Sequence, residues 1–184
     1  MNKIQLLAIS GSLRNHSSNT NVLQAAKILA SPSVDISLYS ELATLPYFNP
    51  DLDCEPLPHT VVSLRQQIDR ADGIIISSPE YAHGVPGSLK NALDWLVSSI
   101  EFPNKPVLLI NTNPRATIAL NSLHEILITM SAQIDRHLTL EIAGKGFNTR
   151  DIVSDRELAT SLTNAIAFFV RFTSRSNKIE NFGK

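Results

Sequence analysis

Short apolar runs alternate with longer segments of helical periodicity along most of the chain. Residues 4–9 and 73–77 are almost continuously apolar, as expected of parallel strands buried on both faces. Residues 21–30 instead repeat apolar side chains at helical spacing, and Ser31-Pro32 ends that pattern. The pattern predicts strands at 4–9, 34–39, 73–77, 106–111 and 135–142, and helices at 21–30, 60–71, 87–98, 118–130 and 157–173.

Strands that alternate with crossover helices predict a parallel sheet with helices on both faces, which is a three-layer α/β/α fold. Five such strands fit the doubly wound order 2-1-3-4-5 better than a barrel. No repeat, low-complexity segment or linker divides the sequence, so we expect one domain over residues 1–184. Ligands of such sheets bind beyond the carboxyl ends of the strands, where the winding reverses. The loops after the first and third strands should therefore lie side by side.

Composition narrows the class of protein further. With 43% hydrophobic and 18% charged residues, the chain has a globular composition. A net charge of −1 without a Lys/Arg run gives no reason to expect nucleic acid or an anionic membrane as a partner. The single cysteine, Cys54, excludes an internal disulfide, and the histidines are too scattered for a metal site. No apolar segment suits a signal peptide or a membrane span, so we expect a cytoplasmic protein.

The loop after the first predicted strand is rich in hydrogen-bond donors. It reads GSLRNHSSN over residues 11–19 and leads into a helix, whose unpaired N–H groups and dipole favour an anion. Gly11 permits a tight turn, and the planar guanidinium of Arg14 fits phosphate oxygens. Hydroxyl groups come from Ser10, Ser12, Ser17, Ser18 and Thr20, and an amide from Asn19.

Two interpretations of this loop remain. Its Ser and Asn residues can simply cap the helix and fill a turn. The whole set at one strand–helix junction, together with Arg14, favours an anion site. The loop has no GxGxxG, no GxxxxGK[ST] and no cysteine ahead of the arginine, which leaves a phosphate cradle built from polar side chains.

The loop after the third predicted strand is stiffened by Pro79 and Pro86. A rigid loop of this kind presents backbone groups to the edge of a heteroaromatic ring, and Tyr81 is suited to stack on or border that ring. Glu80 and His83 could form an acid–base pair, but the favoured interpretation is that both face solvent or a partner subunit.

Neighbouring polar and aromatic residues have structural interpretations. Lys90 and Asp94 are four residues apart, which predicts a surface ion pair, and Trp95 is expected in the core or in a subunit contact. The irregular segment 43–58 is predicted to be a surface loop. Its aromatic residues, Tyr47 and Phe48, either border an acceptor pocket or anchor the loop to the core.

These motifs together resemble the NADPH-dependent FMN reductase family. They are GSLRxxSxN at residues 11–19, PEY at 79–81 and PGSLKNALDW at 86–95. Members of that family include flavin, quinone, azo-dye and chromate reductases. The resemblance covers the chain from the first to the fourth strand. It implies a flavodoxin-like fold, bound FMN, and a homodimer or homotetramer whose contact includes the helix starting at Lys90.

The resemblance also implies cofactor contacts from three loops. The first loop would hold the FMN phosphate, and the second would line the isoalloxazine. Ala82 stands where the family often has Asn, which removes a side-chain contact. The third loop, NTNPRAT at 111–117, lacks the glycines that family members often carry, so its backbone should follow another path. The expected cofactor-binding residues are Ser12, Arg14, Ser17, Asn19, Thr20, Pro79, Glu80, Tyr81, Ala82, Thr112 and Asn113.

The main hypothesis is a flavin-dependent oxidoreductase that passes hydride from NADPH or NADH through flavin N5 to a small acceptor. That acceptor could be a quinone, an azo compound, a nitroaromatic, a metal oxyanion or free flavin. A second hypothesis is a binding or regulatory module that has lost tight FMN binding through its third loop. An electron-carrier flavodoxin fits less well, because the net charge is not strongly acidic. Arg115 could bind an anionic substrate or the 2′-phosphate of NADPH, or it could be solvated.

Overall fold

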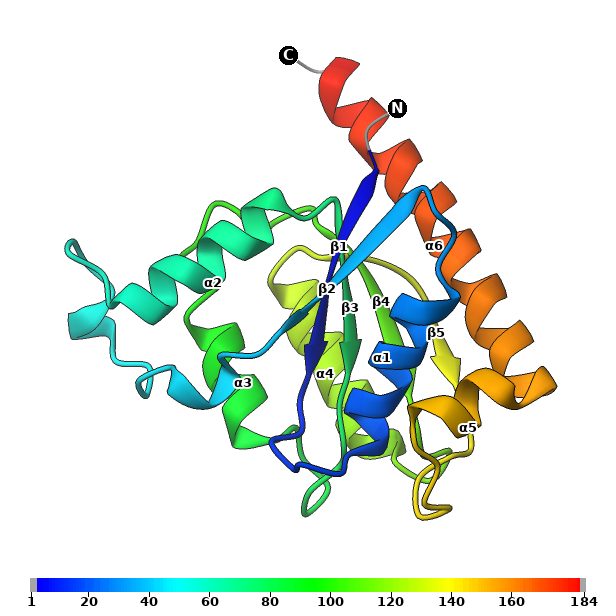
Figure 1. Ribbon diagram of the computed structural model, residues 1–184. Helices are drawn as coiled ribbons and strands as arrows, with labels where there is room; N and C mark the ends of the chain where they lie inside the picture. The colour runs from blue at the N-terminus through cyan, green and yellow to red at the C-terminus, as the bar shows by residue number, and fades with distance from the viewer. Residues whose placement is uncertain (1–2, 183–184) are drawn as a thin grey trace.

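The computed structural model describes residues 3–182 and shows a parallel sheet between two layers of helices (Figure 1). The strand order is β2-β1-β3-β4-β5, which confirms the predicted order and the α/β/α architecture. The strands are β1 (Ile4–Ser10), β2 (Val34–Tyr39), β3 (Gly73–Ser77), β4 (Pro106–Asn111) and β5 (Gln133–Thr139). Helices α1 (Ser18–Leu29), α5 (Thr149–Ser154) and α6 (Arg156–Phe182) cover one face, and α2 (His59–Arg70), α3 (Gly87–Asp94) and α4 (Thr117–Thr129) cover the other.

The central strands have apolar runs because each of their faces packs on a separate helix layer. In β1, Leu6 and Ala8 pack on the side of α1, α5 and α6, whereas Leu7 and Ile9 pack on the side of α2, α3 and α4. Complete burial of a Leu or Ile side chain contributes roughly 1.5–3 kcal/mol. Both faces of the sheet therefore stabilise the fold, and the carboxyl ends of the strands are held at one edge.

Helix α1 begins at Ser18, three residues before the predicted start. Ser17 is its N-cap, and the Ser17 side chain accepts a hydrogen bond from the backbone N–H of Thr20 (3.4 Å). This cap adds a polar first turn that an apolar pattern alone does not reveal. Helix α3 ends at Asp94, not at residue 98, because the following residues form tighter turns.

Strand β5 ends at Thr139, although the apolar pattern predicted a strand over 135–142. Leu140 and Ile142 are buried against the α1 side of the sheet but do not continue the strand. The N–H of Leu140 still donates to the carbonyl of Asn111, the last residue of β4 (2.8 Å), whereas the N–H of Ile142 donates to the carbonyl of Thr112, just after β4 (3.1 Å). The segment after β5 thus folds over the loop after β4.

The carboxyl-terminal helices also differ from the prediction. Helix α5 was not predicted; a capping box between Asn148 and Asp151 defines its start. Helix α6 was expected to end at residue 173 but continues to Phe182. Its inner face comes so close to β3 that a Cβ on Gly73 would lie 2.9 Å from Phe169.

The loop between β2 and α2 is anchored on α3. The side chains of Asn91 and Trp95 both donate to the carbonyl of Pro46 (2.9 and 2.8 Å), and Asn91 accepts from the N–H of Phe48 (2.7 Å). Phe48 meets the buried Trp95 edge-on, with ring centroids 5.1 Å apart. The anchoring interpretation is therefore confirmed for Phe48, and the core position for Trp95, while Tyr47 is exposed. The loop contains two short 3-10 helices, η1 (Leu42–Thr44) and η2 (Pro50–Leu52).

Candidate functional site

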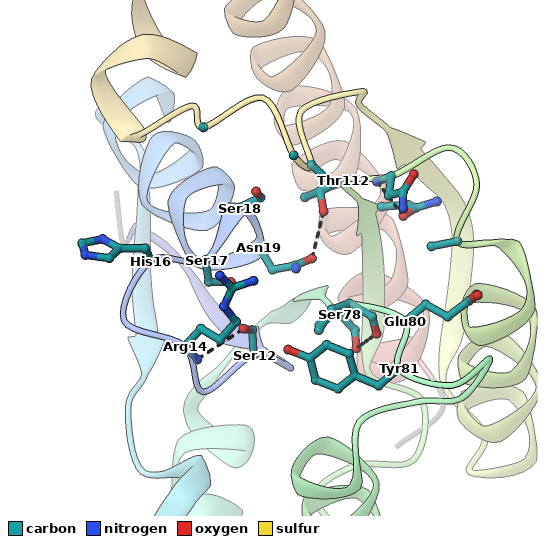
Figure 2. A pocket seen from close by; sticks show the side chains of 17 residues that line it. Ser12, Arg14, His16, Ser17, Ser18, Asn19, Ser78, Glu80, Tyr81 and Thr112 are labelled. Carbon is teal, nitrogen blue, oxygen red and sulfur yellow. Dashed lines mark hydrogen bonds between the residues drawn. The ribbon is translucent and has the colours of Figure 1, made fainter.

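A cleft of about 420 Å³ opens at the carboxyl ends of the strands (Figure 2). Its walls are the loops after β1, β3 and β4 and the turn after β5. All of the predicted cofactor-binding residues line it except Thr20 and Ala82. The lining residues are Ser12, Arg14, His16, Ser17, Ser18, Asn19, Ser78, Pro79, Glu80, Tyr81, Asn111, Thr112, Asn113, Ala116, Ala143, Gly144 and Gly146.

The first loop leaves most of its donors without a partner among residues 3–182. Arg14 is exposed, and its guanidinium has no hydrogen bond there; its backbone N–H donates to Ser12 Oγ (3.4 Å). Gly11 lets the loop run close to the next one, since a Cβ at this position would lie 2.5 Å from Ser78 Oγ. An exposed arginine beside a helix N-terminus and three serines, Ser12, Ser17 and Ser18, forms a positive, donor-rich end of the cleft.

The first turn of α1 uses other polar side chains to tie the site together. Thr20 Oγ1 hydrogen bonds with Ser10 Oγ (2.9 Å), and Thr20 is not among the residues that line the cleft. Asn21 donates to the carbonyl of Phe147 (2.9 Å), which holds the turn after β5. Asn19 is buried, and its side-chain oxygen accepts hydrogen bonds from the hydroxyl groups of Ser77, at the end of β3, and Thr112, just after β4.

The second loop forms a tight hairpin just beyond the cleft. Tyr81 and Gly84 exchange two backbone hydrogen bonds (3.1 and 2.9 Å) around Ala82 and His83. These two residues have φ of 49° and 60°, a left-handed backbone that costs about 1 kcal/mol or more for each L side chain. Ala82 therefore belongs to the turn and does not line the cleft. The hairpin fixes Tyr81 at the cleft wall with its ring about half exposed.

Glu80 is already paired within the protein. One carboxylate oxygen accepts from the N–H of Ala119 (2.8 Å) at the start of α4, and the other lies 3.0 Å from His83 Nδ1. The Ala119 hydrogen bond and, to a smaller extent, His83 lower the pKa of Glu80 below its usual value of 4.5. Its carboxylate thus replaces the missing side-chain cap of α4. His83 faces solvent as expected, but Glu80 does not.

The third loop holds its shape without glycine. Asn111 Oδ1 accepts from the N–H of Asn113 (3.1 Å), and Asn113 Oδ1 accepts from the N–H of Arg115 (3.1 Å). These successive Asx turns satisfy the backbone in place of the flexible glycines. Thr112 is buried and points into the cleft region, whereas Arg115 is exposed and does not line the cleft.

Two parts of the cleft were not predicted from the sequence. Ser78 directly follows β3 and Asn111 is the last residue of β4, so both could have been included by the same topological argument. Gly144 and Gly146 follow β5 and have φ of 78° and 71°, with no atom within 4 Å of an added Cβ. Conformation, not crowding, therefore requires glycine here, and the pair of glycines after the final strand was the available signal.

Other kinds of site find no support in the described part of the chain. Lys90 and Asp94 form the predicted ion pair on α3. Within residues 3–182, no cluster of three or more His, Cys, Asp or Glu side chains could hold a metal ion. No helix in that range is both long and apolar enough to cross a bilayer.

A donor-rich loop at the switch point of a doubly wound sheet is typical of proteins that bind a phosphorylated ligand. The sequence profile described as NADPH-dependent FMN reductase matches residues 4–143, and the chain belongs to this family. The resemblance drawn from the loop motifs is thereby confirmed.

Individual relatives agree with the family assignment. The chain is 39% identical to a quinone reductase of Escherichia coli (strain K12) over 110 residues, and 37% identical to an NAD(P)H-dependent FMN reductase of Pseudomonas aeruginosa over 112 residues. These matches span 58% and 60% of both chains in each pair. Among solved structures, a flavoenzyme NAD(P)H:(acceptor) oxidoreductase from Paracoccus denitrificans superposes with a TM-score of 0.79 and 25% identity, covering 94% of this chain and 98% of that one. The flavodoxin-like fold is thus established.

Proposed function

We propose that the protein is an FMN-containing, NAD(P)H-dependent oxidoreductase that reduces a small acceptor. The observation that carries the proposal is the uneven distribution of free donors in the cleft. Arg14, Ser12, Ser17 and Ser18 gather at one end, where the N–H groups of the first turn of α1 also lack helical partners. This donor set suits a phosphate dianion, and no carboxylate among the cleft residues opposes it except Glu80, whose charge is directed at α4.

The other end of the cleft suits a flat, largely neutral ring. Tyr81 offers an aromatic face and Pro79 an apolar edge, while Thr112 and Asn113 supply polar groups on the far side. A volume of about 420 Å³ lies within the range of small-molecule and cofactor sites. Bound FMN would supply the hydride-accepting ring, and the protein would fix its orientation and exclude water from one face.

The names of the relatives support this assignment. A quinone reductase and an NAD(P)H-dependent FMN reductase are among them, and the family description names both NADPH and FMN. A quinone is therefore the first acceptor to test, ahead of azo compounds, metal oxyanions and free flavin. The glycine-free third loop is ordered by its own Asn side chains and lines the cleft, so it gives no support to a module that has lost FMN.

The assembly and location follow as part of the same proposal. We expect a homodimer or homotetramer, in which Val97 and Ile100 beyond α3 would lose water contact; they are 65% and 90% exposed here. A single exposed thiol, Cys54, and the use of NADPH or NADH support a cytoplasmic location.

The deciding experiment is a visible absorption spectrum of the purified protein before and after FMN is added, followed by anaerobic NADPH and, separately, NADH. Flavin bands that bleach with either nucleotide, and recover when a quinone is added, are the expected result. Protein that neither carries nor takes up flavin would contradict the proposal. Flavin that binds but is not reduced by either nucleotide would indicate an electron carrier instead.

A further inference from the structure

Asn19 lines the cleft, and its side chain is hydrogen bonded to Thr112, just after β4 (Figure 2), and to Ser77, at the end of β3. Ser77 Oγ, at the end of β3, donates to Asn19 Oδ1 (2.9 Å), and Thr112 Oγ1, just after β4, donates to the same oxygen (3.3 Å). All three residues are at most 5% exposed. The amide oxygen of Asn19 is therefore occupied by the protein itself, although the motif had suggested a phosphate contact.

The remaining group of Asn19, its Nδ2, has no hydrogen bond to the described residues and is available to the cleft. The oxygen and the nitrogen of this amide therefore have different roles. The oxygen holds the loops together, while the nitrogen can donate to a ligand anion beside Arg14. An Asn side chain has its acceptor and its donor on two different atoms of one planar group, whereas Ser or Thr has a single oxygen for both.

The bond to Thr112 matters more than the bond to Ser77. Ser77 Oγ has a second acceptor, the carbonyl of Ile110 at 2.8 Å, so it keeps a partner if Asn19 is lost. Thr112 Oγ1 makes no other hydrogen bond among residues 3–182, so losing Asn19 would leave its buried hydroxyl unpaired, which is costly. Thr112 in turn accepts hydrogen bonds through its carbonyl from Ile142 (3.1 Å) and Ala143 (3.0 Å). The contact from Asn19 therefore extends through the third loop to the turn after β5.

We infer that Asn19 is a positioning residue that couples the phosphate end of the cleft to its ring end, by holding Thr112 and the loops that Thr112 carries. The inference rests on the proposed function, because it takes FMN as the ligand. It assigns to Asn19 a role in binding the ring that a phosphate-loop residue would not have.

Riboflavin separates the two roles, because it has the ring and ribityl chain of FMN but no phosphate. We expect Asn19→Ala to weaken both FMN and riboflavin by about tenfold, since the third loop loses its support. Asn19→Asp keeps the acceptor oxygen but replaces the donor with a negative charge, so it should weaken FMN and leave riboflavin binding unchanged. Ser18→Ala, which removes a hydroxyl without touching the third loop, is the matched control and should affect FMN alone. Dissociation constants from flavin fluorescence titrations give the comparison.

Thr112→Val removes the same hydrogen bond from the other side and guards against misfolding of the Asn19 variants. It should weaken riboflavin as Asn19→Ala does, and the double variant should be no weaker than either single variant. Amide hydrogen exchange of flavin-free protein gives a second readout: exchange in residues 112–116 and 142–143 should speed up in Asn19→Ala but not in Asn19→Asp. Unchanged riboflavin affinity and unchanged exchange in Asn19→Ala would overturn the inference. Wild-type protein that binds neither flavin would refute the proposed function, and the coupling would then be judged on exchange alone.

Discussion

The first and second loops of the cleft both carry polar side chains, but they use them in opposite ways. In the first loop, the guanidinium of Arg14 has no partner among the described residues and points to solvent at the cleft. In the second, the carboxylate of Glu80 is bonded to the start of α4 and to His83. The two loops lie against each other, and Gly11 allows the close contact with Ser78.

This difference indicates which part of a ligand each loop meets. Donors that the fold does not use are available to a charged group, so the first loop can bind an anion without breaking any internal bond. A loop whose charges are already paired gains nothing from a charged ligand and presents mainly its shape and its aromatic ring. We therefore expect the first loop to bind its part of the ligand through charge, and the second loop to contribute through its fixed shape.

The largest effect is expected from removing the free charge of the first loop. Arg14→Ala should weaken FMN by roughly 1.5–3 kcal/mol, which is on the order of 10- to 150-fold in dissociation constant, because a charge-assisted phosphate contact is lost. Riboflavin binding should not change. Arg150→Ala, which removes an exposed arginine outside the cleft, is the control. An unchanged FMN dissociation constant in Arg14→Ala would rule out the phosphate role of this residue.

The contact between the two loops can be tested through Gly11. In Gly11→Ala the added Cβ would lie 2.5 Å from Ser78 Oγ and 3.0 Å from Leu89 Cδ2, so the loops must separate. We expect a loss of about 1–3 kcal/mol in the free energy of unfolding, measured with urea, as for other overpacked sites. Adding Ser78→Ala should recover part of the loss. A double variant no more stable than Gly11→Ala would show that Ser78 is not the obstructing group.

The fold could be predicted well because strands buried on both faces appear in the sequence as continuous apolar runs. The runs around Leu6–Ile9 and Gly73–Ser77 have no other simple explanation than central parallel strands. The end of β5 could not be located in the same way. Leu140 and Ile142 are apolar because they are buried, and burial does not reveal that the N–H of Ile142 bonds to Thr112, in the loop after β4, and not to a strand.

The candidate site was predicted in its composition but not in its internal bonding. Polar residues at a strand–helix junction identified Ser12, Arg14 and Ser17, which do line the cleft. The side chain of Asn19 contacts the ends of β3 and β4, whereas that of Thr20 contacts Ser10. Which way each side chain points depends on where α1 begins, and that start is set by the Ser17 cap, not by the apolar pattern. Local geometry also explains why Ala82 does not line the cleft. It lies in a turn with a left-handed backbone, which is not expected for alanine from sequence alone.

The rigidity of the second loop predicts a stabilising substitution. Ala82 has φ of 49°, so Ala82→Gly should relieve strain and raise the free energy of unfolding by about 0.5–1 kcal/mol, even after the added freedom of the unfolded chain. Ala167→Gly, in the exposed middle of α6, should have the opposite sign at a similar size. Thermal unfolding of both variants checks the pair. A destabilised Ala82→Gly variant would show that the hairpin does not store the strain assigned to it.

The smallest effect concerns the paired charge of the second loop and appears as a change with pH. Because the pKa of Glu80 is lower in the folded protein than its usual 4.5, the ionised carboxylate stabilises the fold fully above that pH, and the contribution is lost as the pH falls through the folded value. Glu80→Gln should therefore be less stable than the wild type at neutral pH, and the difference should shrink in acid below 4.5. Urea unfolding of flavin-free protein at neutral pH and at a pH below 4.5 measures the difference in free energy of unfolding. Glu125→Gln, on the exposed face of α4, is the control. A difference between wild type and Glu80→Gln that is the same at both pH values would mean that Glu80 supports α4 by its hydrogen bond alone, and the contrast between the loops would then rest on Arg14.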